Sequence, residues 1–343
     1  MADVRPFRAE RYDEAVAGPL TNLVAPPYDV ISDEQRRMYL ARSPYNVVHV
    51  TLPDSEERAA RSLEEWRGSG VLRREPASAW TLSQTYVGPD GVARTRNGLV
   101  VALRLEPYEN GVVLPHERTH AGPKEGRLRL LRATRTQLEP IFLLHDGAAV
   151  SLPEREPDIE IAGPQSHDRL WHEGDVPDPS ELLIADGHHR YETALAFHEE
   201  DGTDASAWMM VVLVSTREEG LTIFPTHRLA QSVNGARGEP IDEPGDELPG
   251  VVLYRAGRYE LVHGDGLDVD VVDALQPAGV TYTPERAAAV AAVDRGEAEA
   301  AFLIRPTPLD VVFERARRGE VMPQKTTYFF PKLTSGLLFQ PLE

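Results

Sequence analysis

One short segment gathers side chains that suit an anion. It reads Asp186-Gly187-His188-His189-Arg190 and stands between an apolar run and a helical pattern. The free N–H groups and the positive dipole end of a helix N-terminus bind anions, and Gly187 allows a close backbone approach. We assign Gly187, His189 and Arg190 to phosphate binding, His188 to catalysis and Asp186 to a metal ion or to orienting a histidine. The alternative is a helix cap with two surface histidines.

A second segment places histidine and glutamate before a basic helix. Residues 116–120 match the H-E-x-x-H pattern of zinc proteases, whose chemistry needs both histidines on one continuous helix. Pro115 precedes the pattern and Gly122-Pro123 follows it, so the helix is predicted to begin only after the pattern. The zinc protease is therefore the weaker hypothesis. The stronger one is a polar active-site loop.

In this loop, His116 and Glu117 are the candidate catalytic residues, with Glu117 as base or metal ligand. Lys124 and Arg127 stand at the start of the following helix, where both would face an anion. The alternative for the loop is a solvated connection without a chemical role.

The scarcity of lysine draws attention to the end of the chain. Only Lys124, Lys325 and Lys332 stand among the 36 basic residues, and the others are arginine. An ammonium is a compact point charge, so a lysine in such a chain is a candidate for a role that arginine cannot fill. Lys325 with Thr326 and Thr327 resembles a phosphate-contacting trio. The alternative is a buried C-terminal strand with snorkelling lysines.

A carboxylate near the N-terminus is a further candidate. Asp29 follows Pro26-Pro27-Tyr28, and the two prolines force extended backbone before it. A single carboxylate on such a rigid turn suits a substrate hydroxyl, an amine or a metal ion. The alternative is a plain cap for the helix that is predicted after Ser32.

The composition excludes several classes of function. There are 55 acidic and 36 basic residues, and the net charge of −19 argues against binding to nucleic acid or to an anionic membrane. The absence of cysteine excludes thiolate nucleophiles, disulfides and Cys-ligated zinc. No G-x-G-x-x-G, Walker A or G-x-S-x-G pattern occurs. Without an apolar leader or a long apolar run, the expectation is a soluble cytoplasmic protein.

The hydrophobic pattern alternates between strands and helices. It predicts strands at 47–50, 79–87, 99–105, 141–144, 182–185 and 209–215, and helices at 33–41, 55–68, 124–134 and 191–200. This alternation predicts an α/β or α+β fold with a mixed sheet and flanking helices. Residues 1–234 are expected to form the main region and 235–250 a polar Gly/Pro-rich linker or excursion. Residues 251–343 are expected to form a C-terminal α/β segment whose last strand, 322–340, returns to the main core.

Several segments together resemble the bacterial and archaeal family called domain of unknown function 1015. The matching pieces span nearly the whole chain and are Pro6-Phe7-Arg8-Ala9, Pro26-Pro27-Tyr28-Asp29-Val30-Ile31-Ser32, Pro44-Tyr45-Asn46-Val47-Val48, His116-Glu117-Arg118-Thr119, Pro123-Lys124, Ala185-Asp186-Gly187-His188-His189-Arg190-Tyr191-Glu192-Thr193-Ala194 and Met322-Pro323-Gln324-Lys325. This resemblance implies no established activity.

A local resemblance is more informative about chemistry. Gly187-His188-His189-Arg190 at a helix start is similar to the phosphate-binding box of the ParB/sulfiredoxin superfamily. Sulfiredoxins carry a catalytic cysteine at the position of His188, so the missing cysteine excludes that activity. Partition proteins need a DNA-binding helix-turn-helix, which the sequence lacks. The resemblance therefore implies a ParB/sulfiredoxin-like core, elaborated by further segments, with a free-serine kinase as the nearest precedent.

These observations lead to one main hypothesis, a nucleotide-dependent phosphotransferase acting on a small molecule. Gly187 to Arg190 would cradle the phosphates, Lys124, Arg127 and Lys325 would neutralise charge, and Glu117 or Asp29 would act as base. ATP or ADP is the expected phosphate donor, with Mg²⁺ held by Asp186. Two alternatives stay open: a phosphatase or nucleotidase using the same anion site, and a non-catalytic nucleotide or metabolite sensor. The sequence predicts no oligomeric state.

Overall fold

The computed structural model describes residues 1–117, 121–323 and 325–343, with only the backbone of 121–124. In this part of the chain, a mixed sheet of nine strands forms the centre of the fold. Its strands in spatial order are β6 (Val113–Leu114), β11 (Leu182–Asp186), β8 (Ile141–His145), β12 (Trp208–Ser215), β5 (Ala93–Arg104), β4 (Trp80–Val87), β10 (His167–Trp171) and β9 (Ile159–Ala162), with β1 (Val4–Arg5) beside β5. β6 and β11 are parallel, as are β8 and β12, and the other pairs are antiparallel. The predicted α/β class with a mixed sheet is confirmed.

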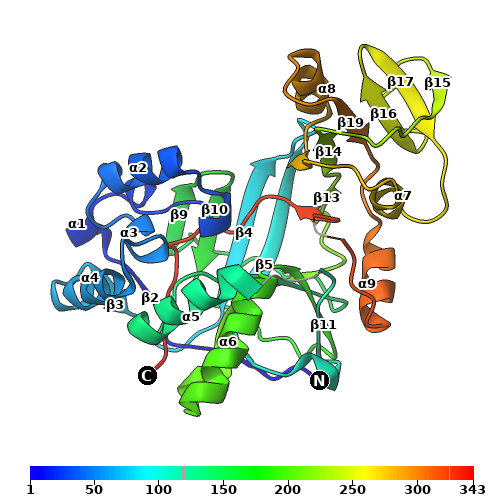
Figure 1. Cartoon of the computed structure of the whole chain (residues 1–343). Helices are drawn as coiled ribbons and strands as arrows, with labels where there is room; N and C mark the ends of the chain where they lie inside the picture. Colours follow the sequence, from blue (N-terminus) through cyan, green and yellow to red (C-terminus); the bar gives the residue numbers. More distant parts are fainter. Residues whose placement is uncertain (118–120, 324) are drawn as a thin grey trace.

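Both faces of this sheet are buried at its central strands. All eight residues of β12 are buried, as the continuous apolar run predicts for a strand covered on both sides. Alternate residues of β5 enter different apolar clusters: Val100 lies in the cluster that includes Trp66 of α4 (Glu56–Gly68), and Val101 in the cluster that includes Tyr191 of α6 (His188–Asp201). Figure 1 shows α6 beside α5 (Ala121–Thr134) below the sheet.

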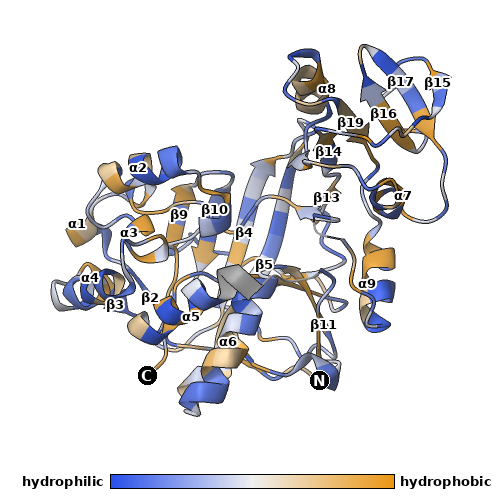
Figure 2. Ribbon diagram, in the orientation of Figure 1, coloured by the Kyte–Doolittle hydropathy of each residue, from blue (hydrophilic) through white to orange (hydrophobic). Residues whose placement is uncertain are grey.

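A second sheet of six strands lies to one side of the main sheet among the described residues (Figure 1). Its order is β15 (Glu239–Ile241), β17 (Arg258–Val262), β16 (Val251–Arg255), β19 (Ala300–Leu303), β14 (His227–Ala230) and β18 (Thr281–Thr283). Helices α7 (Asp268–Ala274) and α8 (Arg286–Asp294) accompany it, and α9 (Leu309–Arg317) follows it in the chain. α9 carries hydrophobic and hydrophilic residues (Figure 2) and buries Val312, Phe313 and Ala316. The predicted domain division stays a prediction.

Three short strand pairs complete the described sheet structure. They are β2 (Glu10–Tyr12) with β3 (Leu72–Arg74), β7 (Thr136–Gln137) with β21 (Gln340–Pro341), and β13 (Ile223–Phe224) with β20 (Tyr328–Phe329). The end of the chain packs into the main core: Phe339 is fully buried and its ring contacts that of Tyr12 edge-on at 5.6 Å. The C-terminal segment therefore packs against β2 near the N-terminus and pairs with β7.

The N-terminal helices follow the capping signals of the sequence. α2 (Asp33–Arg42) begins with a capping box between Ser32 and Gln35, and the Ser55 side chain caps α4. α1 (Glu14–Ala17) and α3 (Val48–Thr51) are single turns. The strand predicted at 47–50 was wrong, because Val48–Thr51 forms the helical turn α3 and Val47 is its N-cap residue. None of the described helices is long and apolar enough to cross a membrane.

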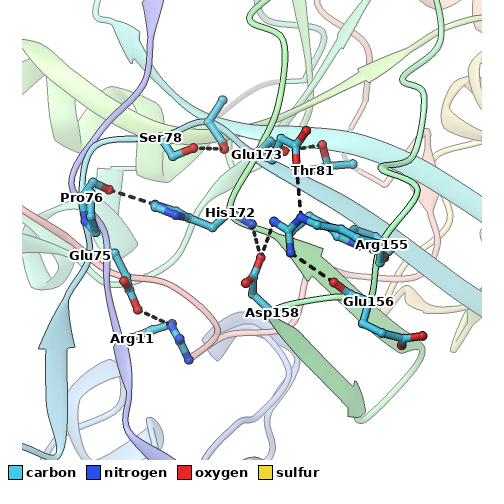
Figure 3. A network of polar contacts seen from close by, with 12 residues as sticks. Arg11, Glu75, Pro76, Ser78, Thr81, Arg155, Glu156, Asp158, His172 and Glu173 are labelled. Atoms are coloured by element: carbon cyan, nitrogen blue, oxygen red, sulfur yellow. Dashed lines mark hydrogen bonds and ion pairs between the residues drawn. The ribbon is translucent and has the colours of Figure 1, made fainter.

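A polar network fastens the outer end of the main sheet to the N-terminal segment (Figure 3). The Arg155 guanidinium donates to Asp158 at 2.8 Å and to Glu173 at 3.1 Å. The backbone N–H of His172 also donates to Asp158, and its ring Nε2 lies 3.0 Å from the carbonyl of Pro76. Because these groups pair with one another and with the backbone, we assign the network to the fold and not to the candidate site.

The turn from β11 into α6 requires glycine. Gly187 has φ +102°, a region that residues with a side chain rarely adopt. A Cβ added at this position would lie 2.5 Å from Cγ2 of Ile141 on β8. The carbonyl of Gly187 accepts from the N–H of Tyr191 and so closes the first turn of α6. The glycine therefore sets where this helix begins against the sheet.

We predict that Gly187→Ala lowers the free energy of unfolding by about 1–3 kcal/mol, because it adds backbone strain and a clash with Ile141. Gly126→Ala in α5 is the matched control, since its added Cβ would meet nothing closer than 3.9 Å. The control is expected to stabilise the protein by about 0.5–1 kcal/mol, as replacing a helical glycine does. Urea denaturation measures both, and an unchanged stability of Gly187→Ala would contradict the requirement.

Candidate functional site

The carboxylate of Asp186 lies between two cations at the end of β11. Its Oδ2 accepts from Nη2 of Arg190 at 2.7 Å, and its Oδ1 accepts from Nζ of Lys332. Burial alone would raise the pKa of this carboxyl, but Lys332 and Arg190 hold it well below its ordinary value. The side chains of Asp186, Arg190 and Lys332 are 17%, 10% and 11% exposed, so the three charges form a nearly buried triad.

Arg190 serves the fold as well as the triad. Its Nη1 donates to the backbone carbonyl of Pro140, just before β8. Burial lowers the pKa of Arg190 while Asp186 raises it, and Glu139 and Asp29 add to the rise, so that the net shift is upward. Asp29 also contributes to raising the pKa of Lys332. The negative charge of the exposed Asp29 thus favours the charged form of both cations of the triad.

Arg127 reaches the same neighbourhood from α5. Its guanidinium lies over the ring of Tyr28, 3.9 Å from the ring centre. The backbone N–H of Tyr28 donates to Glu139 at 3.1 Å, and Ser335 donates to the same carboxylate oxygen at 2.6 Å. Arg127, Glu139 and Arg190 line one pocket between α5 and α6. The structure therefore brings Arg127, Arg190 and the Tyr28-Asp29 turn together from three distant parts of the chain.

His116 and His188 join the two predicted segments directly. The backbone N–H of His116 donates to Nε2 of His188 at 3.2 Å, and the two rings meet edge-on at 4.8 Å. Nδ1 of His116 lies 2.7 Å from the carbonyl of Ile184, and its Nε2 lies 2.9 Å from Oγ1 of Thr327. Burial lowers the pKa of His116 and lowers that of His188 further, so both rings are neutral at neutral pH.

This arrangement fixes the tautomers. A carbonyl accepts only, so Nδ1 of His116 carries the proton and Nε2 accepts from the hydroxyl of Thr327. His188 accepts at Nε2 and so carries its proton on Nδ1. Both histidines were predicted to be catalytic. Both rings are buried, both nitrogens of His116 and Nε2 of His188 have partners, and this favours a positioning role in which the two histidines tie β6, α6 and the C-terminal segment together.

Glu117 and Lys325 lie on the side of the site nearer to the second sheet. Oε1 of Glu117 lies 3.7 Å from Nε2 of His116, and its side chain is 20% exposed. Burial lowers the pKa of Arg228 on β14, and the charge of Glu117 partly offsets this lowering. The Arg228 guanidinium donates to the backbone carbonyl of Lys325 at 3.4 Å. Lys325 is exposed, and its charge helps to lower the pKa of Asp186. The hydroxyl of Thr327 is bound to His116, so the predicted phosphate-contacting trio is not intact.

The contacts described so far do not include Lys124 and His189. Lys124 belongs to the first turn of α5, but its side chain lies outside the described residues, as does the whole of His120. His189 is partly buried, and its carbonyl accepts from the hydroxyl of Thr193 within α6. Lys332 was named only for its rarity, and its ammonium donates to Asp186. Its scarcity as a residue type was the one signal in the sequence that pointed to it.

The donor set does not fit the predicted metal ions. Both carboxylate oxygens of Asp186 are occupied by Lys332 and Arg190, which repel a cation, so the assignment of Asp186 to Mg²⁺ is not supported. Both ring nitrogens of His116 are bound by protein groups, which leaves no lone pair for zinc. Among the described residues, no group of three or more His, Asp or Glu side chains could hold a metal ion.

Solved structures give distant likenesses. A conserved hypothetical protein from Pyrococcus furiosus is 18% identical, with a TM-score of 0.40 over 66% of this chain and 92% of its own. A free serine kinase in complex with AMP is 16% identical, with a TM-score of 0.41 over 66% and 88%. SbnI with a C-terminal truncation, from Staphylococcus aureus, is 12% identical, with a TM-score of 0.44 over 70% and 87%. At these scores the likenesses say nothing of activity.

No curated protein matches this sequence. A family model does match, and it covers residues 4–245, which include the whole main sheet, the β11–α6 turn and the His116 loop. The match ends within the loop that follows β15, so Lys325 and Lys332 lie beyond it. Since the matched part is more than half of the chain, the chain belongs to the family described as protein of unknown function, DUF1015.

Proposed function

We propose that this protein is a nucleotide-dependent phosphotransferase acting on a small molecule. Its anion site would comprise the start of α6, residues 187–190, which includes Arg190, with Arg127 and Lys332 beside it. The observation that carries the proposal is the glycine-led start of α6, which has no capping side chain and stands next to the Asp186 triad. Free N–H groups at a helix start favour phosphate.

The placed donors around this turn support anion binding. Lys332, Arg190 and Arg127 are three cations with the carboxylates of Asp186, Glu139 and Asp29 beside them, so the support comes from donors held in position and not from an excess of positive charge. The triad is held in place before a ligand arrives, so binding a phosphate costs little reorganisation. A phosphoryl group in transfer carries charge on its peripheral oxygens, and fixed donors of this kind stabilise it.

The remaining roles follow from position. Asp29 is exposed and acts on both Arg190 and Lys332, which favours it as the base that takes the proton of the acceptor hydroxyl. Glu117 is the second candidate for that role. Lys124 and Lys325 would add positive charge, while His116 and His188 would hold the turn in place. ATP or ADP is the proposed donor, and free serine belongs among the acceptors to be tested.

We predict that wild-type protein binds pyrophosphate and ATP in calorimetry, and that Lys332→Met weakens pyrophosphate binding by at least about tenfold, the cost of one charge-assisted hydrogen bond. Arg129→Met is the matched control, because Arg129 lies on the same helix as Arg127, is about half exposed and pairs with Glu56. The control is expected to bind as wild type does. Circular dichroism verifies the fold of both variants. Equal affinity of Lys332→Met and wild type would contradict the proposed site.

We predict that Asp29→Asn lowers phosphoryl transfer by about 10²–10⁴-fold while pyrophosphate binding is kept, because only proton acceptance is lost. The assay follows phosphate transfer from ATP to a panel of hydroxyl-bearing small molecules. Glu117→Gln is measured in parallel, and exposed Asp33→Asn serves as control. If both carboxylates are dispensable, the base is neither of them. Phosphate release without an acceptor would indicate a hydrolase, and binding without turnover a sensor.

A further inference from the structure

Arg96 on β5 is a cation in the interior of the protein. It is 1% exposed, and its guanidinium lies 4.5 Å from the ring centre of Phe142. Burial lowers its pKa to about 10, and no carboxylate among the described residues accepts a hydrogen bond from it. A buried charge is costly unless its donors are well used. The partners of Arg96 therefore indicate what it is there to hold.

Those partners lie immediately before Lys332. Nη2 of Arg96 donates to the carbonyl of Pro331 at 2.9 Å, and Nη1 donates to the carbonyl of Phe330 at 3.4 Å. Nη2 also donates to Oε1 of Gln84 on β4 at 2.5 Å. The two carbonyls belong to consecutive residues, so one guanidinium fixes the backbone from which the Lys332 side chain departs.

The same network holds the other side of Lys332. Thr334 donates to the buried Asp168 on β10, which also accepts from Ser166 at 2.6 Å and from Gln84 at 3.0 Å. The backbone N–H of Lys332 itself donates to Oε1 of Gln165 at 2.9 Å. Gln84 thus links Arg96 to Asp168, and the segment 330–334 is tied to β4, β5 and β10 on both sides of the lysine.

We infer that Arg96 is a positioning residue that fixes the backbone at Phe330 and Pro331 and thereby sets the ammonium of Lys332 on Asp186. Its role in phosphate binding rests on the proposed function, whereas its action on Lys332 does not. A lysine side chain is flexible and loses much rotational freedom when it is held in one place. Anchoring its backbone removes part of that disorder in advance, so that the ammonium stays beside the first turn of α6.

Lysine labelling tests this inference without a ligand. The intact protein is treated with a trace of acetic anhydride, and the acetylation of Lys332 is compared with that of exposed Lys325 in the same sample by mass spectrometry. We expect Arg96→Met to raise the relative labelling of Lys332 by about tenfold, the effect of losing one hydrogen bond from a charged donor. Arg96→Lys, which keeps a charged donor, is expected to restore part of the protection.

Two further variants make the labelling decisive. Arg169→Met is the matched control, because Arg169 is a half-buried arginine of the same sheet that contacts Ser83 and the ring of Trp171. It should leave Lys332 as protected as in wild type. Thr334→Val removes the tether to Asp168 while keeping the side-chain shape, and should expose Lys332 to a smaller extent. If Arg96→Met fails to fold, the labelling of Lys332 in Thr334→Val tests the inference instead. Unchanged labelling of Lys332 in the folded variants overturns the inference.

A double-mutant cycle connects the inference to phosphate binding. If Arg96 acts through Lys332, Arg96→Met weakens pyrophosphate binding in the wild-type background but has no further effect on Lys332→Met. Equal losses in both backgrounds would show that Arg96 acts by another route and would overturn the inference. Wild-type protein that binds no pyrophosphate would refute the proposed function alone, because the labelling experiment would still report on Arg96 and Lys332.

Discussion

The carboxylate of Asp186, held between Lys332 and Arg190, is the interaction on which the candidate site depends. Each of these charges would be costly to bury alone, and together they are nearly removed from solvent. Asp186 ends β11 and Arg190 lies in the first turn of α6, so the triad fixes the C-terminal segment to the place where the helix begins. Any ligand at that turn meets cations whose positions are already set.

The pair of His116 and His188 and the hydrogen bonds of Arg96 fix further segments around the Asp186 triad. His116 bonds to His188 and to Thr327, which joins the loop before α5 to the start of α6 and to the residues before β20. Arg96 holds the carbonyls of Phe330 and Pro331 from inside the sheet. The neutral rings and the buried cation thus hold the backbone around the start of α6. The main sheet positions Asp186, and the C-terminal segment adds Lys332 to the candidate site.

Local signals in the sequence predicted the elements but not their contacts. Ser32 and Ser55 begin helices because their hydroxyls cap free N–H groups, and that chemistry is readable from neighbouring residues. The stretch 47–50 is apolar and short, a pattern that strands and buried helical turns share, and it forms a helical turn. Asp186 and Lys332 are 146 positions apart, so no local pattern indicates their pairing. Asp186 was accordingly assigned to a metal ion, although two cations occupy its oxygens.

The most direct measurement is a titration of isotope-labelled protein with pyrophosphate, followed by the backbone amide signals in a TROSY spectrum. We expect the amides of residues 187–190 to shift together and to saturate with the binding isotherm, since their N–H groups would donate hydrogen bonds to the phosphate oxygens. The amide signals of β15 and β17 should not shift. Saturable binding without a shift at residues 187–190, or with shifts only at distant amides, would contradict a phosphate site at the start of α6.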